Sequence, residues 1–234
     1  MNIALIVAAG TGSRMSGADK PKQFLLVKNK PLMIYTIEAF QMHEDINAIV
    51  VVTGEGYEEQ VKDWCKQYGL NKVQAVVLGG DSRQGSVYNG LQAIKKMGAK
   101  SDDIILIQDA ARPLISKEII SKNIEACSEF DAVDTVIKAN DTIISSKSGE
   151  TINDIPNRSE LYQSQTPQTF KFGLIYEAHE KAKAGKIPNV TDDAKLVISM
   201  GKEVRLVEGN KQNFKVTTPD DLLMFEALLN IYKK

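Results

Sequence analysis

The first loop of the chain combines glycines with cationic side chains directly after an apolar run. The run covers residues 3–8, and the loop continues through Gly10, Gly12 and Arg14 to Lys22. A short apolar run that ends in glycines is typical of a buried strand followed by a tight turn. Glycine has no Cβ, so backbone N–H groups in such a loop can approach phosphate oxygens closely. The residues therefore predict a nucleotide-phosphate site, with a plain turn carrying two solvated charges as the simpler alternative.

Two familiar phosphate-binding patterns do not fit this first loop. The dinucleotide fingerprint needs a third glycine where this chain has Met15. The P-loop needs a Gly-Lys-Ser/Thr ending, which the loop lacks. The sequence therefore disfavours a dinucleotide-dependent oxidoreductase and indicates another kind of nucleotide site.

A second glycine-rich loop covers residues 79–86 and follows another apolar run. It reads Gly-Gly-Asp-Ser-Arg-Gln-Gly-Ser, and Arg83 and Ser86 lie where a helix is predicted to start. Paired glycines allow close backbone approach, and the unpaired N–H groups of a helix start favour a phosphate or an acceptor-rich base. This loop is a second candidate for nucleotide contacts.

A third loop, at residues 109–113, reads Asp-Ala-Ala-Arg-Pro. Asp109 could orient a substrate hydroxyl or bind Mg²⁺, and Arg112 could hold a phosphate. Two alanines between them leave room for a ligand. The simpler interpretation is an ion pair within the loop.

Four further polar residues, Arg158, Thr166, Thr191 and Lys215, are scattered over the second half of the chain. Each is unremarkable alone, and Thr191 is also the natural N-cap of a predicted helix. Together with the three loops they supply many anion-binding groups and no obvious activated nucleophile. This combination suits phosphoryl or nucleotidyl transfer, in which positioning and charge neutralisation carry the catalysis.

Histidine is scarce, with only His43 and His179 in the chain. Two histidines argue against a histidine-ligated metal and against a catalytic triad. Both lie in helix-like contexts, and we interpret them as solvated surface residues.

The composition is that of an ordinary globular protein, with 234 residues, 43% hydrophobic and 25% charged. The formal net charge of −1 gives no global attraction to nucleic acid or to an anionic membrane. No apolar run approaches the ~18–20 residues of a membrane span. Cys65 and Cys127 have no C-x-x-C spacing, so we expect a reduced, cytoplasmic protein.

Apolar runs alternate with amphipathic stretches through the first 140 residues. Strands are predicted at 3–8, 48–53, 74–78, 103–108 and 132–137, and helices at 31–43, 57–68, 83–97 and 116–129. The alternation predicts an α/β fold with a mostly parallel sheet and helices on both faces. Ligands bind at the carboxyl ends of strands in such sheets, so the loops after Ala8, Leu78 and Gln108 should share one edge.

The alternation breaks after residue 138. Residues 141–153 read as a hairpin with a turn at Gly149, and we expect a protruding β-arm at about 139–160. Such an arm is marginally stable alone, so it should pack on a second subunit or fold back on its own domain. Helices at 172–184 and 191–200, a strand at 204–208 and a last helix capped by Thr218 complete a single domain, residues 1–234.

The ordered set of motifs resembles the cytidylyltransferases that act on sugar-alcohol phosphates. The motifs are A-A-G-T-G-S-R-M, P-K-Q-F, G-G-D-S-R-Q-G-S-V, D-A-A-R-P, Q-T-P-Q, T-D-D-A and N-F-K-V-T. This family includes the methylerythritol 4-phosphate enzyme of isoprenoid biosynthesis and the ribitol 5-phosphate enzyme of teichoic acid or capsule biosynthesis. The resemblance implies a Rossmann-like nucleotidyltransferase fold, CTP and a polyol phosphate as substrates, Mg²⁺ or another divalent cation, and a homodimer joined by the arm.

The resemblance also implies roles for individual residues. Arg14, Lys22 and Lys215 match the catalytic cations, of which the first two stabilise the α-phosphate. The nucleotide contacts match Ala8, Ala9, Gly10, Gly12, Gly80, Asp81, Arg83, Ser86, Asp109 and Ala110. The polyol-phosphate pocket matches Asp109, Arg112, Thr142, Arg158, Thr166, Thr191 and Lys215, with Thr142 and Arg158 supplied by the partner's arm. Asp109 is the one candidate metal ligand, because CTP phosphates would hold most of the Mg²⁺ coordination.

The resemblance leaves the acceptor substrate open between methylerythritol 4-phosphate and ribitol 5-phosphate. The motifs A-A-G-x-G (residues 8–12), D-A-A-R (109–112) and T-D-D-A (191–194) look more like the methylerythritol enzyme. Asp134-Thr135 and the exit of the arm, at residues 155–158 and 162–163, look more like the ribitol enzyme. The chain departs from the family at Gln108, where a histidine is usual, and one extra residue separates Arg14 from Lys22. A non-catalytic nucleotide-binding subunit on the same fold is the alternative, which the presence of both cations disfavours.

Overall fold

A computed structural model describes residues 1–10, 21–187, 190 and 192–232. Its strands are β1 (Asn2–Ala8), β2 (Leu26–Val27), β3 (Lys30–Pro31), β4 (Ala48–Thr53), β5 (Val73–Leu78), β6 (Ile104–Asp109), β7 (Ala132–Lys138), β8 (Tyr162–Lys171) and β9 (Arg205–Glu208). Its α-helices are α1 (Leu32–Gln41), α2 (Glu58–Gln67), α3 (Arg83–Lys96), α4 (Lys117–Glu129), α5 (Phe172–Lys183), α6 (Asp193–Ser199) and α7 (Pro219–Tyr232). Two short 3₁₀ turns cover Lys22–Phe24 and Arg158–Glu160.

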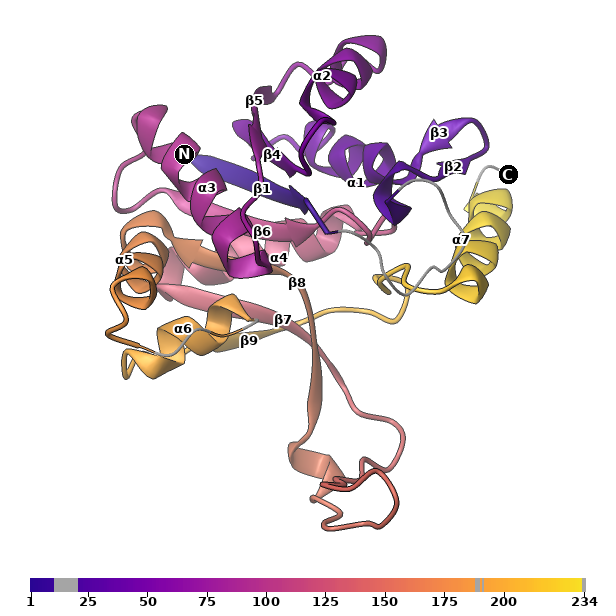
Figure 1. Cartoon of the computed structure of the whole chain (residues 1–234), viewed down its shortest axis with the longest axis vertical. Helices are drawn as coiled ribbons and strands as arrows, with labels where there is room; N and C mark the ends of the chain where they lie inside the picture. The colour runs from indigo at the N-terminus through magenta and orange to yellow at the C-terminus, as the bar shows by residue number, and fades with distance from the viewer. Residues whose placement is uncertain (11–20, 188–189, 191, 233–234) are drawn as a thin grey trace.

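Seven of the strands in the described parts of the chain form one sheet in the order β5-β4-β1-β6-β8-β7-β9 (Figure 1). Strands β5, β4, β1 and β6 are mutually parallel, and β7 and β9 are parallel to each other. Strand β8 runs antiparallel to both β6 and β7. The expected mostly parallel α/β sheet is confirmed.

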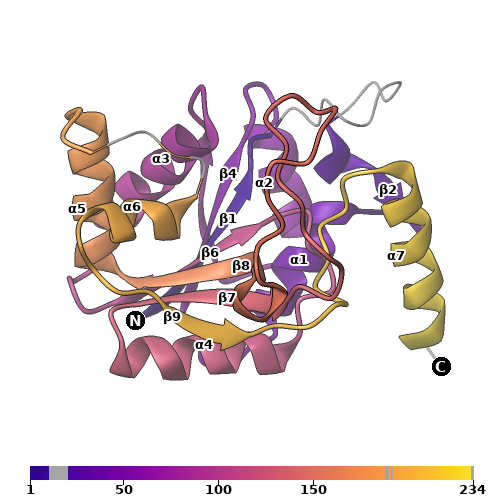
Figure 2. The same cartoon turned by 90° about the horizontal axis from the view of Figure 1, so that it is seen from below.

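Helices cover both faces of the sheet, which explains why its central strands read as continuous apolar runs (Figure 2). One face packs against α1, α2 and α4, with Ile6 and Phe40 in its core. The other face packs against α3, α5 and α6, with Leu5 and Leu91 in its core. Every residue of β4 is buried. This arrangement confirms the predicted helices on both faces.

Strand β8 is the main element that the sequence analysis missed. Its polar segment contains Pro167, and a proline argues against a strand unless the ladder is interrupted. The ladder is interrupted here, because the register between β7 and β8 shifts between Asp134 and Val136. Residues 165–170 are buried although four of them are polar, because their side chains find partners in the fold, such as Asp134 of β7 for Gln168 and Asn123 of α4 for Thr169. The short ladder of β2 with β3 was missed as well.

The predicted arm protrudes from the sheet between β7 and β8, as Figure 1 shows. The predicted hairpin is reduced in the described arm to one isolated antiparallel bridge, between Ser145 and Asp154. Side chains such as the Ser146 hydroxyl bond locally to the arm backbone instead. The predicted turn is present, with Gly149 at a φ of +80°. Exposed apolar residues on the arm are Ile143, Ile144, Ile152 and Ile155.

The two helices whose starts were predicted from Ser116 and Thr218, α4 and α7, do begin at these capping residues. The Ser116 hydroxyl accepts the N–H of Ile119 at the start of α4. The Thr218 hydroxyl accepts the N–H of Asp221 at the start of α7, and the Asp221 carboxylate accepts the N–H of Thr217 and of Thr218. This reciprocal arrangement satisfies N–H groups that a helix start leaves unpaired. Within the described residues, none of the helices is long and apolar enough to cross a bilayer.

The interpretation of His43 as a solvated residue is wrong. Its side chain is buried, and its Nε2 lies 2.9 Å from the Ser121 hydroxyl of α4. His43 therefore links the end of α1 to α4, and a satisfied ring nitrogen explains why burial is tolerated.

Helix α3 lies close to the sheet because of Gly90. A Cβ at this position would lie 2.3 Å from Leu5 Cδ1 and 2.9 Å from Val52 Cγ2. We predict that Gly90→Ala lowers the free energy of unfolding by about 1–3 kcal/mol through overpacking. Alanine normally stabilises a helix interior relative to glycine by roughly 0.5–1 kcal/mol, so a gain in stability in denaturant unfolding would contradict this close packing. Lys96→Ala, at an exposed position of the same helix, is the control.

Candidate active site

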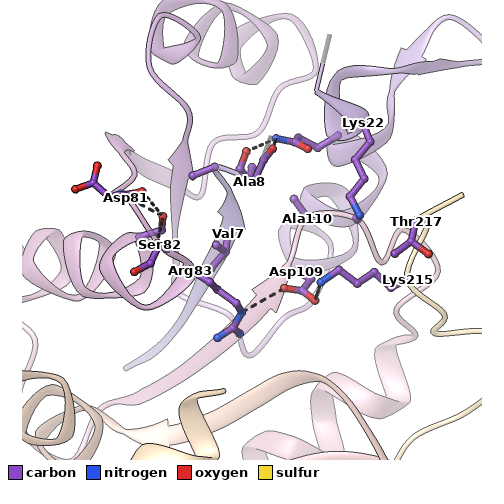
Figure 3. A pocket seen from close by; sticks show the side chains of 16 residues that line it. Val7, Ala8, Lys22, Asp81, Ser82, Arg83, Asp109, Ala110, Lys215 and Thr217 are labelled. Carbon is purple, nitrogen blue, oxygen red and sulfur yellow. Dashed lines mark hydrogen bonds and ion pairs between the residues drawn. The ribbon is translucent and has the colours of Figure 1, made fainter. Parts of the chain in front are cut away.

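The loops after β1, β5 and β6 meet at one edge of the sheet, as parallel strands predict. They enclose a pocket of about 470 Å³ (Figure 3). Of the predicted site residues, those that line it are Ala8, Ala9, Gly10, Lys22, Gly80, Asp81, Arg83, Ser86, Asp109, Ala110 and Lys215. The sequence therefore located most of this pocket correctly.

Gln23 joins the first strand to the segment that carries Lys22. Its Nε2 donates to the carbonyl oxygens of Ala8 at 2.5 Å and of Gly10 at 2.8 Å. The side chain is buried, so these bonds replace the water that it would otherwise bind. Lys22 is placed at the pocket by this contact of its neighbour. The sequence analysis did not identify Gln23, although an amide in the P-K-Q-F motif was the available signal.

The loop after β5 is held in a compact turn by its own hydroxyls. The Ser86 hydroxyl accepts the N–H of Gly80 at 3.1 Å and donates to the carbonyl of Ser82 at 2.9 Å. The Ser82 hydroxyl caps α3 by accepting the N–H of Gly85. A Cβ on Gly80 would approach Gly85 to 2.9 Å, so the turn requires glycine at that position. Ser86, predicted to contact the nucleotide, therefore also shapes the loop.

Asp109 lies at the centre of a cluster of cations. Its Oδ2 is 2.8 Å from Lys215 Nζ and 3.8 Å from Arg112 Nε, and its Oδ1 is 3.8 Å from Arg83 Nε. Burial alone would raise the pKa of Asp109, but Lys215, Arg83 and Arg112 outweigh it and hold the pKa below the ordinary value. The carboxylate is therefore ionised at neutral pH. The ion pair between Asp109 and Arg112, which was the simpler interpretation of the third loop, is therefore present, and it is one of three ion pairs that Asp109 makes.

Arg112 faces a second cavity, which adjoins the first at Lys215. This cavity, of about 420 Å³, is lined by Arg112, Lys215 and Lys211 among others. Arg112 Nη1 donates to the carbonyl of Asn213 at 2.7 Å. Burial is the main cause that lowers the pKa of Arg112 below its ordinary value. Two cationic cavities thus lie next to each other, with Lys215 lining both.

Thr166 bonds to two residues of the site, Asp109 and Asn213. Its hydroxyl accepts the N–H of Asp109 at 3.1 Å, and its carbonyl accepts from Asn213 Nδ2 at 2.8 Å. The side chain is buried and lines neither cavity. Thr166 therefore fixes the end of β6 in this structure.

Two predicted residues, Thr142 and Arg158, line neither cavity. Both are exposed on the arm. Thr142 directly follows Asp141, which lines the second cavity, and Arg158 Nη1 donates to the carbonyl of Asn140, another residue of that lining. The fold of a single chain therefore places both residues beside the second cavity without making them part of its lining.

Three predicted residues, Gly12, Arg14 and Thr191, lie outside the described residues. The prediction that Thr191 caps the following helix is wrong, since the N-cap of α6 is Asp192. The Asp192 carboxylate accepts the N–H of Lys195 at 3.1 Å.

The interpretation of His179 as a solvated residue is also wrong. His179 is buried, and its Nε2 lies 3.1 Å from Asp193 Oδ1. The other Asp193 oxygen lies 2.5 Å from Arg83 Nη1. The sequence held a usable signal, because Ile175 and Ala182 lie four residues before and three residues after His179 and place it in the apolar stripe of α5.

Asp134 and Thr135, which resembled the ribitol enzyme, make contacts inside the sheet. Asp134 Oδ1 accepts from Gln168 Nε2 and from the Ser164 hydroxyl, both at 3.0 Å. Burial raises the pKa of Asp134 to about 6, against the lowering effect of these two bonds. The Thr135 hydroxyl donates to the carbonyl of Pro167 at 2.6 Å. Neither residue lines either cavity.

The described residues contain no group of three or more histidine, cysteine or acidic side chains that could hold a metal. Asp109 is the carboxylate at the pocket centre, and it is already paired with cations. One carboxylate matches the few protein ligands that Mg²⁺ takes when substrate phosphates supply the others. The predicted Asp109 site therefore fits a cation that arrives with a nucleotide.

Comparisons with known proteins agree with this geometry. A sequence model of the family "2-C-methyl-D-erythritol 4-phosphate cytidylyltransferase" (IspD) matches residues 2–231. A protein of that name from Clostridium botulinum strain Okra is 44% identical over 229 residues, which cover 97% of each chain. A 4-diphosphocytidyl-2C-methyl-D-erythritol synthase structure from Anaerococcus prevotii has a TM-score of 0.82 at 29% identity, covering 98% of this chain and 96% of that one. The Thermus thermophilus enzyme structure has a TM-score of 0.78 at 31% identity, covering 98% and 100%.

All three relatives are named for methylerythritol, so the even division between the two acceptors is not supported. The match covers nearly the whole chain, including the three loops of the pocket and the segment that carries Lys215. The chain belongs to the 2-C-methyl-D-erythritol 4-phosphate cytidylyltransferase family and is a nucleotidyltransferase.

Proposed function

We propose that the protein transfers CMP from CTP to 2-C-methyl-D-erythritol 4-phosphate and releases pyrophosphate. The observation that supports this proposal most is that two cationic cavities adjoin each other and share Lys215 as a lining residue. Two phosphates with like charges must approach each other in the reaction. Cations between the cavities relieve that repulsion, and the family to which the chain belongs supplies the identity of both substrates.

The reaction needs no general base. An oxygen of the acceptor phosphate bonds to the α-phosphorus of CTP, while the bond from the α-phosphorus to the bridging oxygen breaks and its electron pair leaves with pyrophosphate. A phosphomonoester has a second pKa of about 6, so the attacking oxygen is already anionic near neutral pH. The protein has to position the two phosphates and stabilise the charge that develops at the α-phosphate.

The residues divide between the two cavities in this proposal. The nucleotide occupies the pocket lined by the β1 and β5 loops, where Gly10, Gly80 and Ala9 leave its wall free of large side chains. Lys22, with Arg14 as the resemblance implies, neutralises the α-phosphate. The acceptor phosphate lies in the second cavity against Arg112 and Lys215. A bound divalent cation would supply charge neutralisation of the triphosphate, with Asp109 as its protein ligand.

The arm completes the acceptor site from a second subunit in this proposal. Thr142 and Arg158 are exposed on the arm and line neither cavity of their own chain. The exposed isoleucines of the arm, such as Ile144 and Ile155, supply apolar surface that a partner would bury. We infer a homodimer of single-domain chains, residues 1–234, joined through the arm at about 139–160. We also infer a cytoplasmic enzyme that works without nucleic acid or a membrane, and its two free cysteines fit a reduced compartment.

Purified protein with CTP and Mg²⁺ should release pyrophosphate when methylerythritol 4-phosphate is added. Ribitol 5-phosphate, the longer unbranched acceptor, should give a kcat/KM at least about tenfold lower, because the acceptor pocket discriminates by shape and hydrogen bonding. Removal of the divalent cation with a chelator should abolish release. Release with ribitol 5-phosphate alone would overturn the proposed substrate.

Lys22→Ala should lower kcat by at least about 10²-fold, because a cation aimed at the developing α-phosphate charge is lost. The thermal unfolding midpoint should change little. Lys28→Ala, an exposed lysine on the nearby β2–β3 turn, is the matched control and should retain activity. Near-normal turnover of the Lys22 variant would show that Lys22 is only a surface charge.

Subunit mixing tests the contribution of the arm. Lys22→Ala and Arg158→Ala proteins should each be nearly inactive alone, because each lacks one cation in every site. Mixed dimers contain one intact site if the arm crosses to the partner, so activity should recover to roughly a quarter of the wild-type value. If Arg158 served its own chain, no mixed dimer would hold an intact site, and activity would not recover.

A further inference from the structure

Two carboxylates contact different nitrogens of the Arg83 guanidinium. Its Nη1 lies 2.5 Å from Asp193 Oδ2, and its Nε lies 3.8 Å from Asp109 Oδ1. Asp109 faces the pocket (Figure 3). The side chain of Asp193, in contrast, is only 1% exposed. Arg83 itself lines the pocket. Asp193 does not line the pocket but contacts Arg83, a cation that does.

Both oxygens of Asp193 are engaged by side chains. Oδ1 lies 3.1 Å from Nε2 of the buried His179, and Oδ2 pairs with Arg83. The backbone N–H of Asp193 donates to Gln168 Oε1 at 3.2 Å. Contacts from α5 and α3 therefore fix the carboxylate, and the contact from β8 fixes the backbone of the same residue. Burial by itself raises the pKa of Asp193, but Arg83 and His179 outweigh it and lower the pKa below the ordinary value.

We propose that Asp193 is a positioning residue that acts through Arg83. The inference rests on the proposed function and extends it to a residue outside both cavities. Asp193 fixes the Arg83 guanidinium at the pocket wall, at the start of α3. Without it, Arg83 would lose the carboxylate that it contacts at 2.5 Å and would compete with Lys215 for Asp109. That competition would disturb the cation that both cavities share.

Net charge and positioning predict opposite effects for the loss of this acid. Asp193→Asn removes a negative charge from the surroundings of a site for polyanions. If charge alone mattered, the variant would bind CTP more tightly and keep its turnover. If Asp193 positions Arg83, kcat falls even though the site has become more positive, since small misplacements of a reacting group are costly.

Asp192 offers a matched control one residue away. It carries the same charge, caps α6 and accepts from Gln168 Nε2 at 2.9 Å. No bond between Asp192 and Arg83 is recorded in the described structure, although its charge also raises the pKa of Arg83. Asp192→Asn therefore removes a comparable charge and disturbs the same helix start without breaking the Arg83 pair.

The test compares Asp193→Asn, Asp192→Asn, Arg83→Ala and the double variant Arg83→Ala/Asp193→Asn by pyrophosphate release at saturating substrates. We expect Asp193→Asn to lower kcat by at least about tenfold, and Asp192→Asn to lower it by less than about threefold. In the Arg83→Ala background, Asp193→Asn should lower kcat no further, because the two residues act as one unit. Thermal unfolding midpoints identify variants that fail to fold, and far-UV circular dichroism confirms the fold of the remainder.

Three results would overturn the inference while the proposed function stands. The first is an equal fold-loss from Asp193→Asn with and without Arg83, which would give Asp193 an independent structural role. The second is a loss from Asp192→Asn as large as that from Asp193→Asn. The third is a lower KM for CTP with unchanged kcat. Absence of pyrophosphate release from the wild-type protein would instead overturn the proposed function itself.

Discussion

The site depends on keeping one nearly buried carboxylate ionised. Asp109 is 12% exposed at its side chain and would be protonated more readily there if it stood alone. Lys215, Arg83 and Arg112 reverse that tendency, and the same carboxylate keeps three mutually repelling cations together. Removing one partner of such a buried cluster leaves an uncompensated charge, so the cluster forms or fails as a unit. Because this cluster lies between two cavities, its cations can neutralise two phosphates that react with each other.

The sheet brings these charges together from distant parts of the chain. Asp109 ends β6, Arg83 begins α3 after β5, and Lys215 precedes α7. The parallel order of β5, β4, β1 and β6 directs their carboxyl ends to one edge. Strand β8 stabilises that edge through Thr166, whose hydroxyl accepts the backbone N–H of Asp109. A residue that lines neither cavity therefore maintains the geometry within them.

The sequence predicted those features of the fold that depend on residues close together in the chain. Apolar runs located the strands, and Ser116 and Thr218 located helix starts, because a cap acts within three residues. Strand β8 was missed because its polar side chains gain partners only in the folded sheet, as Gln168 does with Asp134. His179 and Asp193 pair across two helices, and residue spacing alone does not reveal a contact of that kind. The resemblance supplied the roles of Thr142 and Arg158, which line neither cavity of their own chain.

The central claim is that cations at the pocket hold Asp109 in its ionised form. Carbon-detected NMR titration of the protein, with Asp109 assigned by comparison with Asp109→Asn, measures this directly. The account predicts a pKa for Asp109 below the ~3.9 of an unperturbed aspartate. It also predicts that Lys215→Ala raises this pKa, because the closest cation is lost. A wild-type pKa at or above the unperturbed value would contradict the account, since Asp109 would then not be the centre of a cation cluster.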